Sequence, residues 1–228
     1  IYATFLAIGG PALGNLSVTK LVANWFEGKA GMALGIAAIG ISFSGVILPI
    51  LVDPLIDLIG WRNVYLVFGT IVILILIPVV RLIVVNTPEE IGQNKDNLET
   101  QPTSSEDKKL MDVSDFFKSK LFWIISLTFA FQFLAMGGVL LHLPLHSEKI
   151  GFSETFSFLS FPIKQQVFAY SLAALGGVVG KVLFGYLVDK LSANKPVMIM
   201  MLMQALGIFG LSYVDTFLFF TISCFIFG

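Results

Sequence analysis

Apolar runs of membrane-spanning length fill most of this sequence and constrain its fold more than any other feature. A helix needs about 20 residues to cross a bilayer, and six runs of roughly that length are followed by a shorter one. The runs cover residues 1–26, 31–52, 63–85, 121–146, 166–188, 196–214 and 216–228. The sequence lacks the segments of alternating hydrophobicity, about ten residues long, that transmembrane β-barrels require. The pattern therefore predicts an all-α membrane protein.

The composition agrees with a chain dissolved in lipid. Of the 228 residues, 56% are hydrophobic and only 13% are charged, whereas about a quarter of the residues in a soluble domain are charged. So few polar residues cannot cover a soluble surface, which excludes soluble enzymes and secreted disulfide scaffolds. The net charge of −1 indicates no nucleic-acid partner, so the expected partner is the lipid bilayer.

Catalytic and metal-binding patterns are missing from the sequence. It contains no HExxH, GxSxG or P-loop pattern, and its single cysteine, Cys224, excludes an internal disulfide and a multi-cysteine metal cage. His142 and His146 are four residues apart, but a zinc site would need further ligands, and we favour a hydrogen-bonded pair near the membrane surface. We expect no enzymatic activity, no cofactor and no metal.

The polar segment 86–120 interrupts the apolar runs and predicts a flexible central linker, with a short amphipathic helix from Ser114 to Lys120. Positive residues favour cytoplasmic loops. On the linker side the loops hold eight lysines, Lys29, Lys95, Lys108, Lys109, Lys118, Lys120, Lys190 and Lys195. On the opposite side they hold Arg62, Lys149 and Lys164. We therefore place the linker in the cytoplasm.

Four motifs resemble one family in their order and spacing. They are Asn24 to Gly35 (NWFEGKAGMALG), Gly60-Trp61-Arg62, Pro88 to Gly92 (PEEIG) and Gly185 to Lys190 (GYLVDK). Together they resemble the major facilitator superfamily, and within it the oxalate/formate antiporter and monocarboxylate-transporter-like branch. The stretch from Glu154 to Gln166 is longer than the connection that family members usually have there.

The resemblance implies a helical bundle of which this chain would carry helices four to ten, and both chain ends look cut. Residues 1–85 would be the last helices of the N-terminal half, 86–120 the linker and 121–228 the first helices of the C-terminal half. The implied function is secondary active transport of small organic anions, mono- or dicarboxylates, by alternating access. We expect a monomer that spans the plasma membrane several times. An efflux carrier for lipophilic drugs is the alternative, and a seven-span receptor is a less favoured one.

Lys181 is the strongest candidate for substrate binding. It precedes Asp189 by eight residues, which places it about 12 Å inside the membrane at 1.5 Å per residue, and charges at such depths usually serve function. The alternative is a side chain that extends to the membrane surface. In the resembling branch an arginine four residues before the loop glycine binds the substrate carboxylate, and Lys181 has that position relative to Gly185. All fifteen acidic residues lie in loops or near helix ends, so an anionic substrate would balance the lysine.

Further polar residues complete the prediction. Asn15 and Gln132 lie near the middle of their runs, where transporter sites are found, although either amide could instead join two helices. Gly185, Asp189 and Lys190 are predicted to form a gate at the linker side, in which Gly185 permits close helix approach and Asp189 pairs with a basic group. A simple helix cap is the alternative for these three residues.

Overall fold

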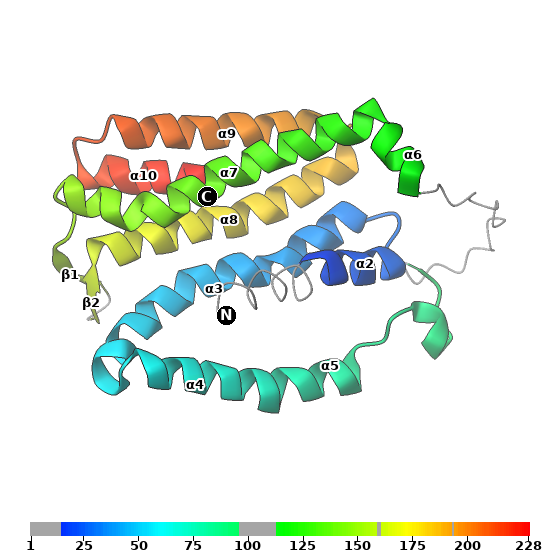
Figure 1. Ribbon diagram of the computed structural model, residues 1–228, viewed down its shortest axis with the longest axis horizontal. Helices are drawn as coiled ribbons and strands as arrows, with labels where there is room; N and C mark the ends of the chain where they lie inside the picture. The colour runs from blue at the N-terminus through cyan, green and yellow to red at the C-terminus, as the bar shows by residue number, and fades with distance from the viewer. Residues whose placement is uncertain (1–14, 96–112, 159–160, 193) are drawn as a thin grey trace.

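The computed structural model describes residues 15–95, 113–158, 161–192 and 194–228, and it is built almost entirely of helices packed side by side (Figure 1). In chain order these are α2 (Asn15–Trp25), α3 (Ala30–Ile59), α4 (Trp61–Ile71), the π-helical turn η1 (Val72–Leu76), α5 (Ile77–Ile83), the 3₁₀ turn η2 (Pro88–Ile91), α6 (Val113–Lys118), α7 (Lys120–Lys149), α8 (Gln165–Lys190), α9 (Asn194–Ser212) and α10 (Phe217–Phe227). The strands β1 (Thr155–Phe158) and β2 (Phe161–Lys164) form a hairpin between α7 and α8. The predicted all-α class is confirmed.

Within the described residues, five helical segments are long and apolar enough to cross a membrane. They are Ala30–Ile59, Trp61–Ile83, Lys120–Lys149, Gln165–Lys190 and Asn194–Ser212, and they match the second to sixth predicted runs. Their large apolar side chains face outward, as Leu74 (69% exposed) and Phe131 (68% exposed) illustrate. Such a surface is stable in lipid and not in water.

Helix α3 is longer than the sequence predicts. It continues to Ile59, beyond the expected end at residue 52, and it contains Pro49 and Pro54. Membrane helices tolerate proline because neighbouring helices and local adjustments satisfy the backbone groups that it frees. The helix ends at Gly60, whose φ of +76° is a left-handed conformation that glycine adopts without a steric cost.

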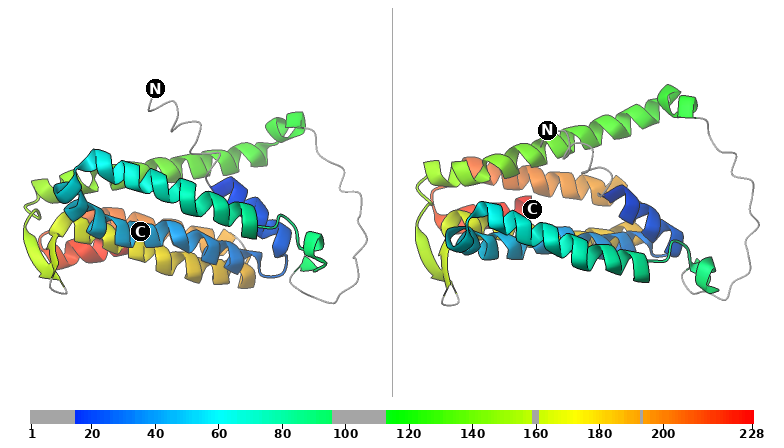
Figure 2. Two further views of the ribbon diagram at one scale, coloured as in Figure 1. Left: turned by 90° about the horizontal axis from the view of Figure 1, so that it is seen from below. Right: turned by 60° about the horizontal axis from the view of Figure 1, so that its bottom comes forward.

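The helices run antiparallel between two ends of the bundle (Figure 1). We call the end where α3 begins and α8 finishes the linker end, and the opposite end, where β1 and β2 lie, the hairpin end. Helices α3 and α8 pack side by side along their lengths. Helices α4 and α5 lie beyond α3, and α7, α9 and α10 lie on the other side of α8 (Figures 1 and 2).

The hairpin is the main element that the sequence did not predict. Its strands are antiparallel, with Thr155 opposite Lys164 and Phe156 opposite Ile163. The Phe156 ring contacts Phe168 of α8 edge-on, with the two centroids 5.2 Å apart, and Ile163 is buried. These contacts hold the hairpin against α8, so the described residues of the long connection noted in the sequence belong to the hairpin end.

The chain after α5 forms a turn at the start of the predicted linker. Trp25 Nε1 at the end of α2 donates to the Val85 carbonyl at 3.1 Å, and this bond holds the chain that leaves α5. Buried Pro88 then opens η2, and Gly92, with φ of +71°, closes it. The predicted amphipathic helix appears as α6, Val113–Lys118. Residues 96–112 of the predicted linker lie outside the described residues.

Candidate functional site

A cavity of about 450 Å³ lies between α3, α7, α8, α9 and α10. Most of its lining is apolar, with Met136, Met200 and Met203 among the side chains. Five polar side chains also line it, namely Ser42, Gln132, Tyr170, Lys181 and Gln204. A mostly apolar wall with a few converging polar groups is typical of a small-molecule site.

Lys181 of α8 is directed toward the middle of the bundle. Its Nζ donates to Ser42 Oγ of α3 at 2.5 Å. The backbone of Lys181 lies so close to Gly35 that a Cβ at Gly35 would collide with the Lys181 carbonyl oxygen. Ser42 is seven residues, about 10 Å, farther from the linker end than Gly35 at the helical rise. The ammonium therefore points into the cavity, and the alternative of a side chain extended to the linker-end surface is not what the structure shows.

Two glutamines line the cavity and bond to each other. Gln132 Nε2 of α7 donates a short hydrogen bond to Gln204 Oε1 of α9. Gln204 is only 9% exposed. Gln132 follows the start of α7 by twelve residues and Gln204 follows the start of α9 by ten, so both lie about 15–18 Å from the linker end. The amides thus stand near the middle of the spans.

The predicted site residues are brought together in part. Lys181 and Gln132 line the same cavity. Asn15 is the first residue of α2, and its side chain lies outside the described part of the chain. Gln204 was missed by the sequence reasoning, although an amide inside an apolar run was the signal that selected Gln132. Ser42 gave no such signal because it stands among other small residues of α3.

At the linker end, Asp189 of α8 caps the first turn of α3. Its Oδ1 accepts from the Gly31 N–H at 2.9 Å, and its Oδ2 accepts from the Met32 N–H at 2.8 Å. The first N–H groups of a helix have no partner within the helix, and the helix dipole favours an anion there. Among the described residues, the partners of Asp189 are thus backbone amides, whereas the sequence predicts a pairing with a basic side chain.

Close contact between α3 and α8 accompanies this cap. A Cβ at Gly185 would lie 2.8 Å from the Gly31 carbonyl oxygen, so the predicted close helix approach at Gly185 is present. Lys190 instead remains with its own helix, where its Nζ lies 6.0 Å from the centroid of the Tyr186 ring. Gly185 and Asp189 thus join the two helices, whereas Lys190 makes no hydrogen bond or ion pair with α3 among the described residues.

At the hairpin end a second polar contact joins α3 to the residue that directly precedes α8. Lys164, the last residue of β2, forms an ion pair with Asp53 of α3, with 3.0 Å between Nζ and Oδ2. Its Nζ also donates to Asp53 Oδ1 at 3.1 Å. Both side chains are about 40% exposed. The interface of α3 and α8 therefore carries a carboxylate contact at each end.

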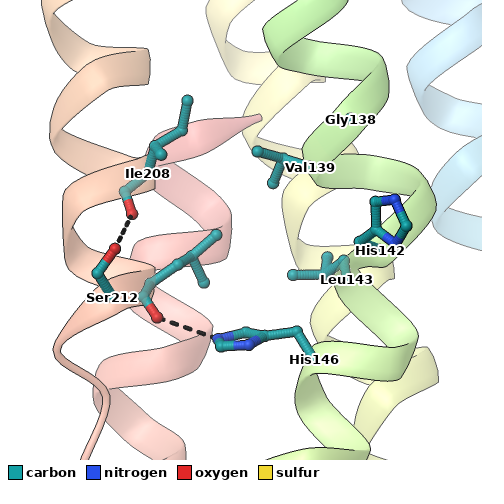
Figure 3. A pocket seen from close by; sticks show the side chains of 8 residues that line it. Gly138, Val139, His142, Leu143, His146, Ile208 and Ser212 are labelled. Atoms are coloured by element: carbon teal, nitrogen blue, oxygen red, sulfur yellow. Dashed lines mark hydrogen bonds between the residues drawn. The ribbon is translucent and has the colours of Figure 1, made fainter.

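A smaller hollow of about 300 Å³ between α7 and α9 contains the two histidines. Figure 3 shows His146 reaching across to the Leu211 carbonyl of α9, at 3.1 Å from Nε2, while His142 stands apart from it. The expected bond between the two histidines is replaced by this bond to the backbone. Among the described residues, no three His, Cys, Asp or Glu side chains are grouped as metal ligands.

Comparison with protein families decides the identity of the chain. The model of the Major Facilitator Superfamily matches residues 1–228. The chain belongs to this superfamily. No curated protein and no solved structure matched it. Superfamily members are transporters rather than enzymes, and the apolar helices make this transporter an integral membrane protein.

The motifs that carry the resemblance lie at the turns of the transporter. Trp25 joins the end of α2 to the chain after α5, Gly60 separates α3 from α4, and Pro88 opens η2. The motif from Gly185 to Lys190 ends α8 and contacts the start of α3. Three of the motifs thus shape the linker end, and the side chains that line the cavity lie deeper in the bundle.

Proposed function

We propose that the transporter carries small organic anions, mono- or dicarboxylates, by alternating access around the cavity that Lys181 lines. The observation that carries this proposal is the position of the Lys181 ammonium inside an otherwise mostly apolar cavity. The resemblance to the oxalate/formate antiporter and monocarboxylate-transporter-like branch supports the same substrate class. We further propose that the protein works as a monomer in the plasma membrane with the linker in the cytoplasm.

The charge of the cavity favours an anionic ligand. Lys181 is the charged side chain among those that line it, and no Asp or Glu side chain belongs to the described lining. A cation at this depth is costly unless an opposite charge approaches it. A substrate carboxylate would supply that charge and accept hydrogen bonds from the ammonium, which carries three donors.

The amides of the cavity would orient the substrate. Gln132 and Gln204 already bond to each other, and a primary amide has both donor and acceptor atoms. The pair can therefore meet a second polar group of the substrate while Lys181 meets its carboxylate. Asn15 stays part of this proposal as a residue of the neighbouring α2.

Lipophilic drugs are the second candidate substrates, because methionine and phenylalanine side chains such as Met200 and Phe184 also line the cavity. A competition assay in proteoliposomes of the full-length protein separates the two classes. We expect unlabelled carboxylates to inhibit or exchange with labelled oxalate or lactate, and hydrophobic cations to leave the uptake unchanged. Inhibition by the cations alone would contradict the anion proposal.

We also propose that Gly185, Asp189 and Lys190 belong to a gate at the linker end. In the superfamily two halves move against each other around a central site. We assign α2 to α5 to one half and α7 to α10 to the other, with 86–120 as the linker. The cap of Asp189 on α3 would then hold the halves together at the linker end and release them when that end opens.

The Asp189→Asn variant tests the gate. An amide keeps the shape of the carboxylate but loses one of the two acceptor oxygens and the charge. The charge alone is worth about 1 kcal/mol at a helix N-terminus. We expect a cysteine introduced at Met136, in a Cys224→Ser background, to react about five-fold faster with an impermeant thiol reagent added on the linker side. Asp57→Asn, at the other end of α3, serves as the matched control. Equal reaction rates in the Asp189 variant and the control would count against the gate.

A further inference from the structure

The hydroxyl of Ser42 is fixed between two parts of α8. On one side it accepts the hydrogen bond from Lys181 Nζ at 2.5 Å. On the other side it occupies the space left by the missing side chain of Gly177, because a Cβ there would lie 2.6 Å from Ser42 Oγ. The hydroxyl therefore has little freedom to move away from the ammonium.

This contact decides where the charge of Lys181 lies. A lysine inside a membrane normally extends its flexible chain toward the nearest polar surface, which for Lys181 is the linker end. Ser42 stands about 10 Å farther from that end than Gly35, the neighbour of the Lys181 backbone. The bond to Ser42 therefore holds the ammonium in the opposite direction, inside the cavity that both residues line.

We infer that Ser42 is a positioning residue for the anion site, an inference that rests on the proposed function. Ser42 keeps the Lys181 ammonium available to the substrate carboxylate and completes the site from α3, whereas the lysine belongs to α8. The ammonium has three donors and uses one on Ser42, which leaves donors for the substrate. The hydroxyl accepts from Lys181 and retains its own O–H as a donor for the same carboxylate.

The two residues of the site thus come from two helices, Ser42 from α3 and Lys181 from α8, and these helices pack together where the two proposed halves meet. An anion bound to Lys181 and Ser42 together would contact both α3 and α8. Loss of the hydroxyl should weaken the binding of the anion more than it slows the movement of a transporter that has already bound it. A change in KM with little change in maximal velocity is the expected signature.

The test compares Ser42→Ala with Ser44→Ala in proteoliposomes of the full-length protein, with oxalate and lactate as probes. Ser44 also belongs to α3, but its hydroxyl donates to the Ile41 carbonyl of its own helix, and it does not line the cavity. A hydrogen bond to a charged group is worth enough to change KM roughly ten-fold. We expect that rise for Ser42→Ala at nearly unchanged maximal velocity, no change for Ser44→Ala, and a KM within about three-fold of wild type for Ser42→Thr, which keeps the hydroxyl.

Other outcomes distinguish a failure of the role of Ser42 from a failure of the proposed anion transport. If Lys181→Gln loses uptake while Ser42→Ala matches Ser44→Ala, the role of Ser42 is wrong and the anion proposal stands. If Ser42→Ala lowers the maximal velocity at constant KM, Ser42 acts in helix packing and not in positioning, which also overturns the inference. If Lys181→Gln transports both probes normally, the proposed function itself fails and the inference fails with it.

Discussion

Replacing Lys181 with glutamine should abolish anion uptake while the protein remains inserted and folded. The variant leaves the substrate carboxylate without its counter-charge in the cavity, and removal of one partner from a buried charge pair costs about 2–5 kcal/mol. We expect uptake of oxalate and lactate in proteoliposomes to fall by about 30-fold or more, since each 1.4 kcal/mol corresponds to a factor of ten.

Two control variants make the Lys181 experiment specific. Lys181→Arg should retain part of the activity, because the charge stays while its shape and hydration change. Lys195→Gln, at exposed Lys195 in the first turn of α9, should leave uptake unchanged. A substrate that binds only the folded protein raises its stability, so oxalate or lactate should stabilise the wild type against heat and not the glutamine variant. Near-normal uptake by Lys181→Gln would remove the main argument for an anionic substrate.

Adding one methyl group at Gly35 should destabilise the bundle. A Cβ there would collide with the carbonyl oxygen of Lys181 on α8, and a backbone atom cannot move aside as a flexible side chain can. Overpacking of this kind costs about 1–3 kcal/mol. We expect Gly35→Ala to lower the melting temperature in detergent, as followed by tryptophan fluorescence, and to reduce uptake because α3 and α8 cannot close fully.

Gly40 provides a control of opposite sign on the same helix. Within the described part of the chain, no atom beyond the adjoining backbone of α3 lies within 4 Å of a Cβ placed at Gly40, and alanine is more stable than glycine inside a helix by about 0.5–1 kcal/mol. Gly40→Ala should therefore raise the melting temperature slightly. The same shift in both variants would mean that α3 and α8 do not pack as closely as the structure shows.

The spanning helices could be predicted because each depends on one local property, the length of its apolar run. The same property made Lys181 and Gln132 visible, since a polar side chain inside such a run is exceptional. It also hid the true end of α3, because Asp53, Pro54 and Asp57 interrupt the apolar run although the helix continues as far as Ile59. Local composition thus predicted which elements exist and missed where one of them ends.

The contacts of the candidate site could not be predicted in the same way. Asp189 was expected to pair with a basic side chain, but its partners are the N–H groups of Gly31 and Met32. Every residue except proline carries a backbone N–H, so residue type does not predict such partners. Ser42 and Lys181 are far apart in the chain and meet because glycines let α3 and α8 approach closely. The hairpin depends likewise on contacts between its own Phe156 and Phe168 of α8. These contacts arise from tertiary packing, and the pattern of a single sequence does not show which distant residues will meet.

The ion pair of Lys164 and Asp53 connects the transporter to the solution that bathes its hairpin end. Lys164 continues into α8 and Asp53 belongs to α3, so the two helices cannot separate at that end unless the pair breaks. An exposed ion pair contributes about 0–1 kcal/mol, and it weakens as the salt concentration rises, because the Debye length falls to about 3 Å at 1 M salt. Salt in that one compartment would therefore ease opening toward it, while salt in the other compartment would leave this contact unchanged.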